Sequence, residues 1–195
     1  MAVEARRLES VDDVFGIEAA SRVLIETLPP WMQELGLLVE AVEAGRPASA
    51  PPDWQPGAII RLPFSMRLSR GGIVCPQALM AAADTAMALA CAAVWNGQRP
   101  ASPIDQTIHF LRPANVDILA DARIVRIGRN TVFGRVSLSS AIDGRPIGMV
   151  STASSRRAST AILRLRLSGA CAATCSRESL FLRLGARFGV CQHFQ

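Results

Sequence analysis

The apolar pattern of the chain is densest between residues 78 and 95, where every residue except Asp84 and Thr85 is apolar. Pro76 precedes this run and suits the first position of a helix, because its missing N–H costs nothing there. Asn96-Gly97 follows the run and is typical of a helix C-terminus. A helix that is apolar on all faces must be enclosed on all faces. The pattern therefore predicts one long helix at the centre of the fold.

Alternating apolar and polar positions flank this helix on both sides. Before it, "AIIRLPFSMRLS" predicts a strand in which Pro63 marks an edge or a bulge. After it come four more alternating segments with short turns between them: "SPIDQTIHFLRPA", "ILADARIVRIG", "NTVFGRVSLSSA" and "RPIGMVSTASS". Short turns between alternating segments indicate an antiparallel meander. We therefore predict an α+β fold, in which a long central helix is wrapped by a curved antiparallel sheet.

The chain of 195 residues has room for one domain with extensions. Ser10 reads as the N-cap of a helix that ends near Thr27, before two prolines. The next segment, "WMQELGLLVEAVEAG", fits either a helix or a strand with a helical lead-in. We expect an N-terminal helical arm (1–29), a central domain (30–155) and a C-terminal extension (156–195).

The net charge of +5 is concentrated in the C-terminal extension, which holds seven arginines and one glutamate. Residues 1–155 hold 14 arginines and 15 acidic residues, and the chain has no lysine. A partner such as nucleic acid or anionic lipid could therefore be bound only by the extension. The extension shows no sustained period, and we expect it to be poorly ordered. We predict no nucleic-acid partner.

The other classes that the composition addresses are secreted, membrane and metal-binding proteins. The charged start "MAVEARRLESVDDVF" is unlike a signal peptide, and five cysteines fit reduced thiols in a cytoplasm. Residues 73–95 are long enough to span a bilayer, but Asp84 near their centre would cost about 2.5–3.5 kcal/mol. The spacing of Cys171, Cys175, Cys191 and His193 matches no known zinc class. We therefore expect a cytoplasmic protein without a membrane partner or a metal.

Asp84 is the most informative residue, because an unpaired charge in an apolar segment costs on the order of several kcal/mol. One interpretation is a catalytic acid or base, since burial raises the basicity of a carboxylate. The other is a structural carboxylate that accepts a hydrogen bond or pairs with an arginine across a dimer interface. The sequence leaves both open.

Three stretches carry a resemblance to a known family. "ALMAAADTAMALA" has an Ala-Asp-Thr-Ala centre at residues 83–86, "IDQTIHFLRPA" ends in Phe-Leu-Arg-Pro-Ala at 110–114, and "ARIVRIGRNTVFGRVSLSSAIDGRPIGMVSTA" supplies the later strands. In this order they resemble the hotdog-fold acyl-CoA thioesterases, most of all the phenylacetate-pathway type. The resemblance covers roughly residues 33–155.

The resemblance implies hydrolysis of acyl-CoA or a related acyl thioester without a cofactor, by a homodimer or homotetramer. It also implies that Asp84 activates water or attacks the carbonyl itself. The family's usual His-Gly-Gly motif is replaced here by Cys75-Pro76-Gln77, and Pro76 has no N–H to donate. The donor to the thioester oxygen is therefore expected to be the backbone of Gln77 or Ala78, or the Gln77 side chain.

Six further residues are predicted to contact the substrate: Gly71, Gly72, Cys75, Thr85, Arg112 and Arg129. The two arginines suit phosphate oxygens, and their alternative is a solvated strand end. Thr85 either holds water or packs, and Cys75 has no neighbouring histidine to make it a nucleophile.

Two other functions remain open. A non-catalytic hotdog protein that binds acyl-CoA or serves in assembly is favoured by Pro76. A dehydratase or hydratase would need a histidine beside its acid, and neither His109 nor His193 is well placed for that role.

Overall fold

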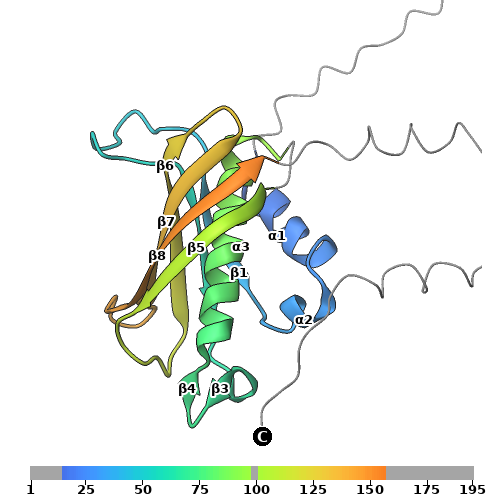
Figure 1. Ribbon diagram of the computed structural model, residues 1–195, viewed down its shortest axis with the longest axis vertical. Coiled ribbons are helices and arrows are strands. Elements are labelled where there is room, and N and C mark those ends of the chain that lie inside the picture. Colours follow the sequence, from blue (N-terminus) through green and yellow to red (C-terminus); the bar gives the residue numbers. More distant parts are fainter. Residues whose placement is uncertain (1–14, 98–100, 157–195) are drawn as a thin grey trace, which may run out of the picture. The chain divides into compact units, whose positions relative to one another are not determined.

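The computed structural model describes residues 15–97 and 101–156, all of which belong to the first of two units, Met1–Ala158 and Ser159–Gln195. Within these residues a six-stranded antiparallel sheet packs against one long helix, α3 (Figure 1). The elements are α1 (Ile17–Glu26), α2 (Pro30–Gln33), β1 (Leu38–Glu43), β2 (Gly57–Leu62), a 3-10 turn η1 (Met66–Leu68), β3 (Ser69–Arg70), β4 (Ile73–Val74), α3 (Pro76–Val94), β5 (Ala101–Phe110), β6 (Ile118–Ile127), β7 (Thr131–Ser140) and β8 (Pro146–Arg156). The predicted α+β class is confirmed.

The strand order in the sheet is β1-β2-β6-β7-β8-β5. The predicted meander is confirmed for β6, β7 and β8, which pair as consecutive neighbours. β5 does not join it beside β6, because residues 111–117 carry the chain across the end of the sheet and β5 pairs with β8 instead. β5 is therefore an edge strand with one side unpaired within the described chain. Pro63 follows the end of β2, which is an interior strand.

The core lies between α3 and the sheet. Alternate residues of the central strands are buried, including Ile118 and Ile124 of β6 and Val136 of β7. At Gly134 an added Cβ would lie 2.4 Å from Cε of Met87, so the missing side chain lets the helix approach the sheet closely. Burying large aliphatic side chains stabilises a fold by about 1.5–3 kcal/mol each. This packing fixes α3 on the sheet.

α3 begins and ends where the sequence predicts. Pro76 is its first residue, and Asn96 (φ 48°) and Gly97 (φ 68°) follow its C-cap in the left-handed region. The prediction that all its faces are enclosed is wrong for one stripe, which the described elements leave at least partly uncovered. The stripe is partly or largely exposed and consists of Gln77, Met80, Ala81, Asp84, Ala88 and Ala92.

The N-terminal helix is shorter than predicted. α1 starts at Ile17 with Gly16 as its N-cap, and the Phe15 N–H donates to Asn96 Oδ1 at 2.9 Å. This contact with the end of α3 holds residue 15 outside the helix, while Ser10 lies outside the described residues. The segment "WMQELGLLVEAVEAG", whose pattern fits either a helix or a strand with a helical lead-in, is the latter, since α2 precedes β1.

α3 is also long and apolar enough to cross a membrane by length and composition alone. In the structure 61% of that window is buried, and the core helix of a folded domain passes the same test. The predicted extension beyond Arg156, with Cys171, Cys175, Cys191 and His193, lies outside the described residues. Among the described residues no group of three His, Cys, Asp or Glu could hold a metal ion.

Candidate functional site

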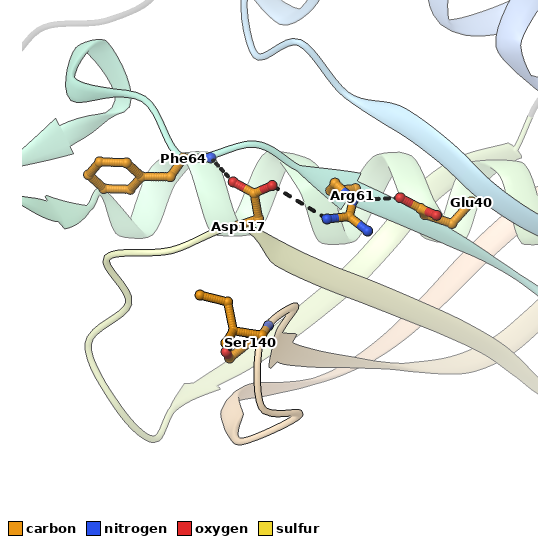
Figure 2. A network of polar contacts seen from close by, with 6 residues as sticks. Glu40, Arg61, Phe64, Asp117 and Ser140 are labelled. Carbon is orange, nitrogen blue, oxygen red and sulfur yellow. Dashed lines mark hydrogen bonds and ion pairs between the residues drawn. The ribbon is translucent and has the colours of Figure 1, made fainter.

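The loops at one end of the sheet are held together by Asp117, at the start of β6 (Figure 2). Asp117 Oδ1 accepts the Phe64 N–H at 2.8 Å, and Oδ2 lies 3.4 Å from Nη1 of Arg61. Nε of Arg61 is 2.5 Å from Oε1 of Glu40, which extends the network to β1. The backbone carbonyl of Asp117 accepts the Ala141 N–H at 2.9 Å. One residue therefore joins the exit of β2, the entry of β6 and the turn after β7.

The segment that starts at Phe64 leads directly to the N-terminus of α3. Gly71 and Gly72 form its two-residue turn between β3 and β4, with φ of 62° and 76° that favour glycine. The Val74 N–H donates to the carbonyl of Ala114 at 2.8 Å, and the Cys75 N–H donates to the carbonyl of Leu68 at 2.8 Å. The first turn of α3 is therefore fixed from both sides.

Among the described residues, only one backbone N–H at this helix end lacks an acceptor. Pro76 has no N–H, and the N–H groups of Ala78 and Leu79 both donate to the carbonyl of Cys75, at 3.0 and 3.3 Å. Within the described residues the Gln77 N–H has no protein acceptor, and its side chain is exposed. Of the predicted backbone donors, the geometry therefore favours Gln77 over Ala78. Cys75 is the half-buried N-cap, and its side chain makes no capping hydrogen bond.

Asp84 lies in the middle of the uncovered stripe of α3 and is half-buried. No hydrogen bond or ion pair reaches its carboxylate from the described residues, and desolvation by burial raises its pKa above the ordinary value of 3.8. The charge of Asp84 also affects the buried Cys91 thiol. The pKa of Cys91 is raised to about 12, mainly by burial and secondly by the charge of Asp84. The described part of one chain therefore leaves this carboxylate partly desolvated and without a protein partner.

Thr85, the neighbour of Asp84, points elsewhere. It is 4% exposed, and its Oγ1 donates to the carbonyl of Ala81, one turn earlier, at 2.8 Å. Because the hydroxyl hydrogen is used inside the helix, this geometry favours packing over holding water.

Gln77 and Asp84 share one face of α3 but are two turns apart. Seven residues at 1.5 Å each separate them by about 10 Å along the helix axis. A reacting carbonyl would have to lie about 3 Å from both the donor and the base or its water. One chain therefore holds the two halves of a site without bringing them together.

The two arginines predicted to bind phosphate do not share a site within one chain. Arg112 lies in the loop before β6, and Arg129 lies in the turn after it. β6 has ten residues, so about 30 Å separates its two ends. Only Arg112 is at the end of the sheet that holds the N-terminus of α3, and its Nη1 donates to the carbonyl of Pro146 at 3.4 Å. His109 is exposed and pairs with Met149 in the sheet.

A cavity of about 300 Å³ opens at this same end, between α3 and the segment after β5. We call it the α3 cavity. Its walls are Ile73, Val74, Pro76, Leu79, Phe110, Leu111, Arg112, Pro113 and Ala114. Sequence reasoning missed both this cavity and Asp117. The only local signal for Asp117 was an acid just before a strand, and nothing in the spacing pointed to Phe64.

Comparison with known proteins gives one family match. Residues 72–147 match the family model of the thioesterase superfamily, a range that contains Gln77, Asp84 and all the walls of the α3 cavity. No curated protein matches the chain.

Solved structures of similar fold come from several bacteria. A Pseudomonas aeruginosa protein is 26% identical, with 72% of this chain and 98% of that one covered and a TM-score of 0.59. The Escherichia coli PaaI protein from the phenylacetic acid degradation operon is 18% identical, with 73% and 94% covered and a TM-score of 0.59. A thioesterase of Haemophilus influenzae is 16% identical, with 75% and 93% covered and a TM-score of 0.59. The last two matches concern the fold alone.

Proposed function

We propose that the chain belongs to the hotdog-fold thioesterase superfamily, because residues 72–147 match that family model, and that it hydrolyses acyl-CoA, or a related acyl thioester, to the free acid and the thiol. The observation that carries the proposal is Asp84, a desolvated carboxylate without a partner on the one uncovered stripe of the central helix. A folded chain rarely keeps such a group for stability, since an uncompensated charge is costly. Carboxylates whose pKa is raised by burial are found at many functional sites.

In this proposal Asp84 acts as a general base. It accepts a proton from a water molecule, whose oxygen attacks the thioester carbonyl, and the carbonyl π electrons move to oxygen. When the tetrahedral intermediate collapses, the C–S bond breaks and the thiolate leaves, to be protonated to the thiol. General-base catalysis contributes about 10²–10⁴-fold to the rate. Direct attack by the carboxylate, followed by hydrolysis of the anhydride, gives the same products.

The negative charge that develops on the carbonyl oxygen needs a donor. The free Gln77 N–H lies in the first turn of α3, where the helix dipole also favours negative charge. The Pro76 ring removes one further donor that a different residue would supply. Loss of one oxyanion donor costs about 10²–10³ in rate, so we expect a modest turnover.

The site requires a second copy of the chain. Because Gln77 and Asp84 are about 10 Å apart in one helix, the donor of one chain must meet the carboxylate of another. Two antiparallel copies of α3 would achieve this with a two-fold axis beside Met80 and Ala81, midway between the two groups. Met80 is 41% exposed, and the unpaired edge of β5 lies beside it, since Gln106 Nε2 donates to the Met80 carbonyl at 3.3 Å. A free strand edge also favours a partner. We therefore propose a homodimer with two shared sites.

Pro76 at the helix start favours a second candidate function, because it weakens the oxyanion site. In that case the chain binds acyl-CoA, or serves in assembly, without hydrolysing it. Membership in the phenylacetate-pathway group would make an aromatic acyl-CoA the first substrate to try.

Hydrolysis is tested by following thiol release from a series of acyl-CoA esters, with Asp84→Ala and Asp84→Asn beside the unaltered protein. A matched control is Asp53→Asn, which changes an exposed loop carboxylate. We expect the two Asp84 variants to lose about 10²–10⁴-fold in kcat and the control to keep its rate. Equal rates in the unaltered protein and both Asp84 variants would remove the enzymatic assignment.

A further inference from the structure

We propose that the α3 cavity binds the hydrocarbon part of the acyl group, and that it selects acyl groups without hydroxyl substituents. This inference rests on the proposed hydrolysis of acyl thioesters. The cavity is lined by the first turns of α3 and by the Phe110–Ala114 segment, and among its walls only Arg112 carries a charge.

The wall backbone offers few N–H donors to a polar ligand. Pro76 and Pro113 have no N–H. The N–H groups of Leu111 and Arg112 both donate to the carbonyl of Ile147, at 2.8 and 3.2 Å. Two further wall donors, those of Val74 and Leu79, are also used by backbone carbonyls.

A ligand oxygen that accepts hydrogen bonds from water would therefore find few N–H donors to replace them on entry. Each unsatisfied polar group costs about 1–3 kcal/mol, which is roughly 10–100-fold in affinity. A hydrocarbon group has no such bonds to lose. The amide-containing pantetheine arm of coenzyme A fits this cavity poorly for the same reason, which leaves the acyl group as the occupant.

Three apolar wall residues are more exposed to solvent than the residues of a hydrophobic core are. Ile73 is 44% exposed, Phe110 46% and Leu111 49%, and all three line the same cavity. Contiguous exposed apolar surface marks a binding site more often than a free surface. A cavity of about 300 Å³ is at the lower end of the range for small-molecule sites. Its size fits a short aliphatic or a single-ring aromatic acyl group.

The position and charge of the cavity suit the same substrate. Pro76 and Leu79 line it, and the free N–H of Gln77 lies in the same turn of α3. A thioester oxygen bound by that N–H would have its acyl group beside the cavity. Arg112 has no acidic partner among the described residues, and the one hydrogen bond that its side chain makes there is a long contact with the carbonyl of Pro146. A cation beside an apolar cavity complements a substrate that joins a hydrocarbon to a polyanion.

Two wall residues allow the cavity to be resized from its surface. Ile73→Trp should fill it and Phe110→Ala should widen it, and both positions are exposed enough to accept the change. The matched control is Met149→Ala, which alters a 58% exposed apolar side chain outside the cavity. For each variant, kcat/KM is measured with butyryl-CoA, octanoyl-CoA and 3-hydroxybutyryl-CoA.

We expect the ratio of kcat/KM for octanoyl-CoA to that for butyryl-CoA to fall about tenfold or more in Ile73→Trp, and to rise by a similar factor in Phe110→Ala. The control should keep the ratio within about twofold. The unaltered protein should prefer butyryl-CoA to its 3-hydroxy analogue by about tenfold or more. Hydrolysis with unchanged ratios in both wall variants would overturn the subsite and leave the proposed function standing.

Binding of S-butyl- and S-octyl-CoA thioethers, measured by calorimetry, separates the two proposals. If no ester is hydrolysed but the wall variants shift the thioether preference in the expected directions, the proposed function fails and the subsite stands. If the variants bind both thioethers as the unaltered protein does, another group fills the cavity, for example a side chain of a second copy, and the subsite is wrong. Melting temperatures of all variants identify any that fail to fold.

Discussion

Replacing Asp84 with asparagine removes a charge and keeps the shape of the side chain. In the folded chain the carboxylate is half-buried, and no donor among the described residues meets it. In the unfolded chain the same carboxylate is fully hydrated. The folded state therefore carries an electrostatic cost at neutral pH that asparagine does not have, and we expect Asp84→Asn to be more stable than the unaltered protein.

The size of this effect follows from the burial of Asp84. A buried polar group without a partner costs about 1–3 kcal/mol, and more when it is charged. Because Asp84 keeps part of its surface in water, the lower part of that range applies, and we expect a gain of about 1–2 kcal/mol in the free energy of unfolding. For a chain of this length each kcal/mol raises the melting temperature by roughly 2–4 °C.

The sign of the pH dependence is the sharper test. Burial raises the pKa of Asp84 in the folded state, so the folded state holds this proton more tightly than the unfolded state does. Stability of the unaltered protein therefore falls as the pH rises from the ordinary value of 3.8 through the folded pKa, and stays lower above it. Asp84→Asn lacks this loss. The difference in unfolding free energy between the two proteins should be small below pH 3.8 and grow as the pH rises.

The measurement is urea unfolding of both proteins at a series of pH values, with protein concentration held constant. Asp53→Asn serves again as the control and should follow the unaltered protein. A difference that does not change with pH would refute the reasoning. So would an unaltered protein that is the more stable of the two at neutral pH, because Asp84 would then have a cationic or hydrogen-bonding partner.

Three further outcomes follow. The acid limb of kcat/KM should lie above pH 3.8, because the raised pKa of Asp84 keeps the base protonated to higher pH, and a pH-rate profile checks this. Met80→Glu should give monomers by size-exclusion chromatography with light scattering, because like charges would meet at the proposed two-fold axis, whereas Met149→Glu should leave the oligomer intact. Asp117→Ala should lower kcat by about tenfold to a hundredfold through misplacement of the α3 N-terminus, with little change in KM. Asp117→Asn should restore most of the rate, because its side-chain oxygen still accepts the Phe64 N–H; equal losses in both variants would argue against that role.

The sequence was most informative about structure where its signals are local. Pro76 and Asn96-Gly97 mark the ends of α3 by their own backbone preferences, and the helix lies between them. The partner of β5 was not predictable in this way, because pairing with β8 depends on how residues 111–117 cross the sheet. The start of α1 was misplaced for a similar reason, since a contact with α3 keeps Phe15 outside the helix.

The same division holds for the candidate site. Asp84 could be predicted because a lone charge in an apolar run is visible in the sequence. The choice between Gln77 and Ala78 required the hydrogen bond from Ala78 to the Cys75 carbonyl, which exists only in the folded chain. The separation of Arg112 from Arg129 by the length of β6 likewise depended on the sheet.

The two-turn spacing of Gln77 and Asp84 also bears on genetics. If each working centre takes its donor from one chain and its base from another, a single gene product carries two halves of different centres and no whole one. Chains with Asp84→Asn would then pair with unaltered chains to give assemblies that retain one centre of two, so a defective allele would weaken its counterpart without silencing it. Dilution would reduce activity further, because a dissociated monomer would be inactive even when it is correctly folded.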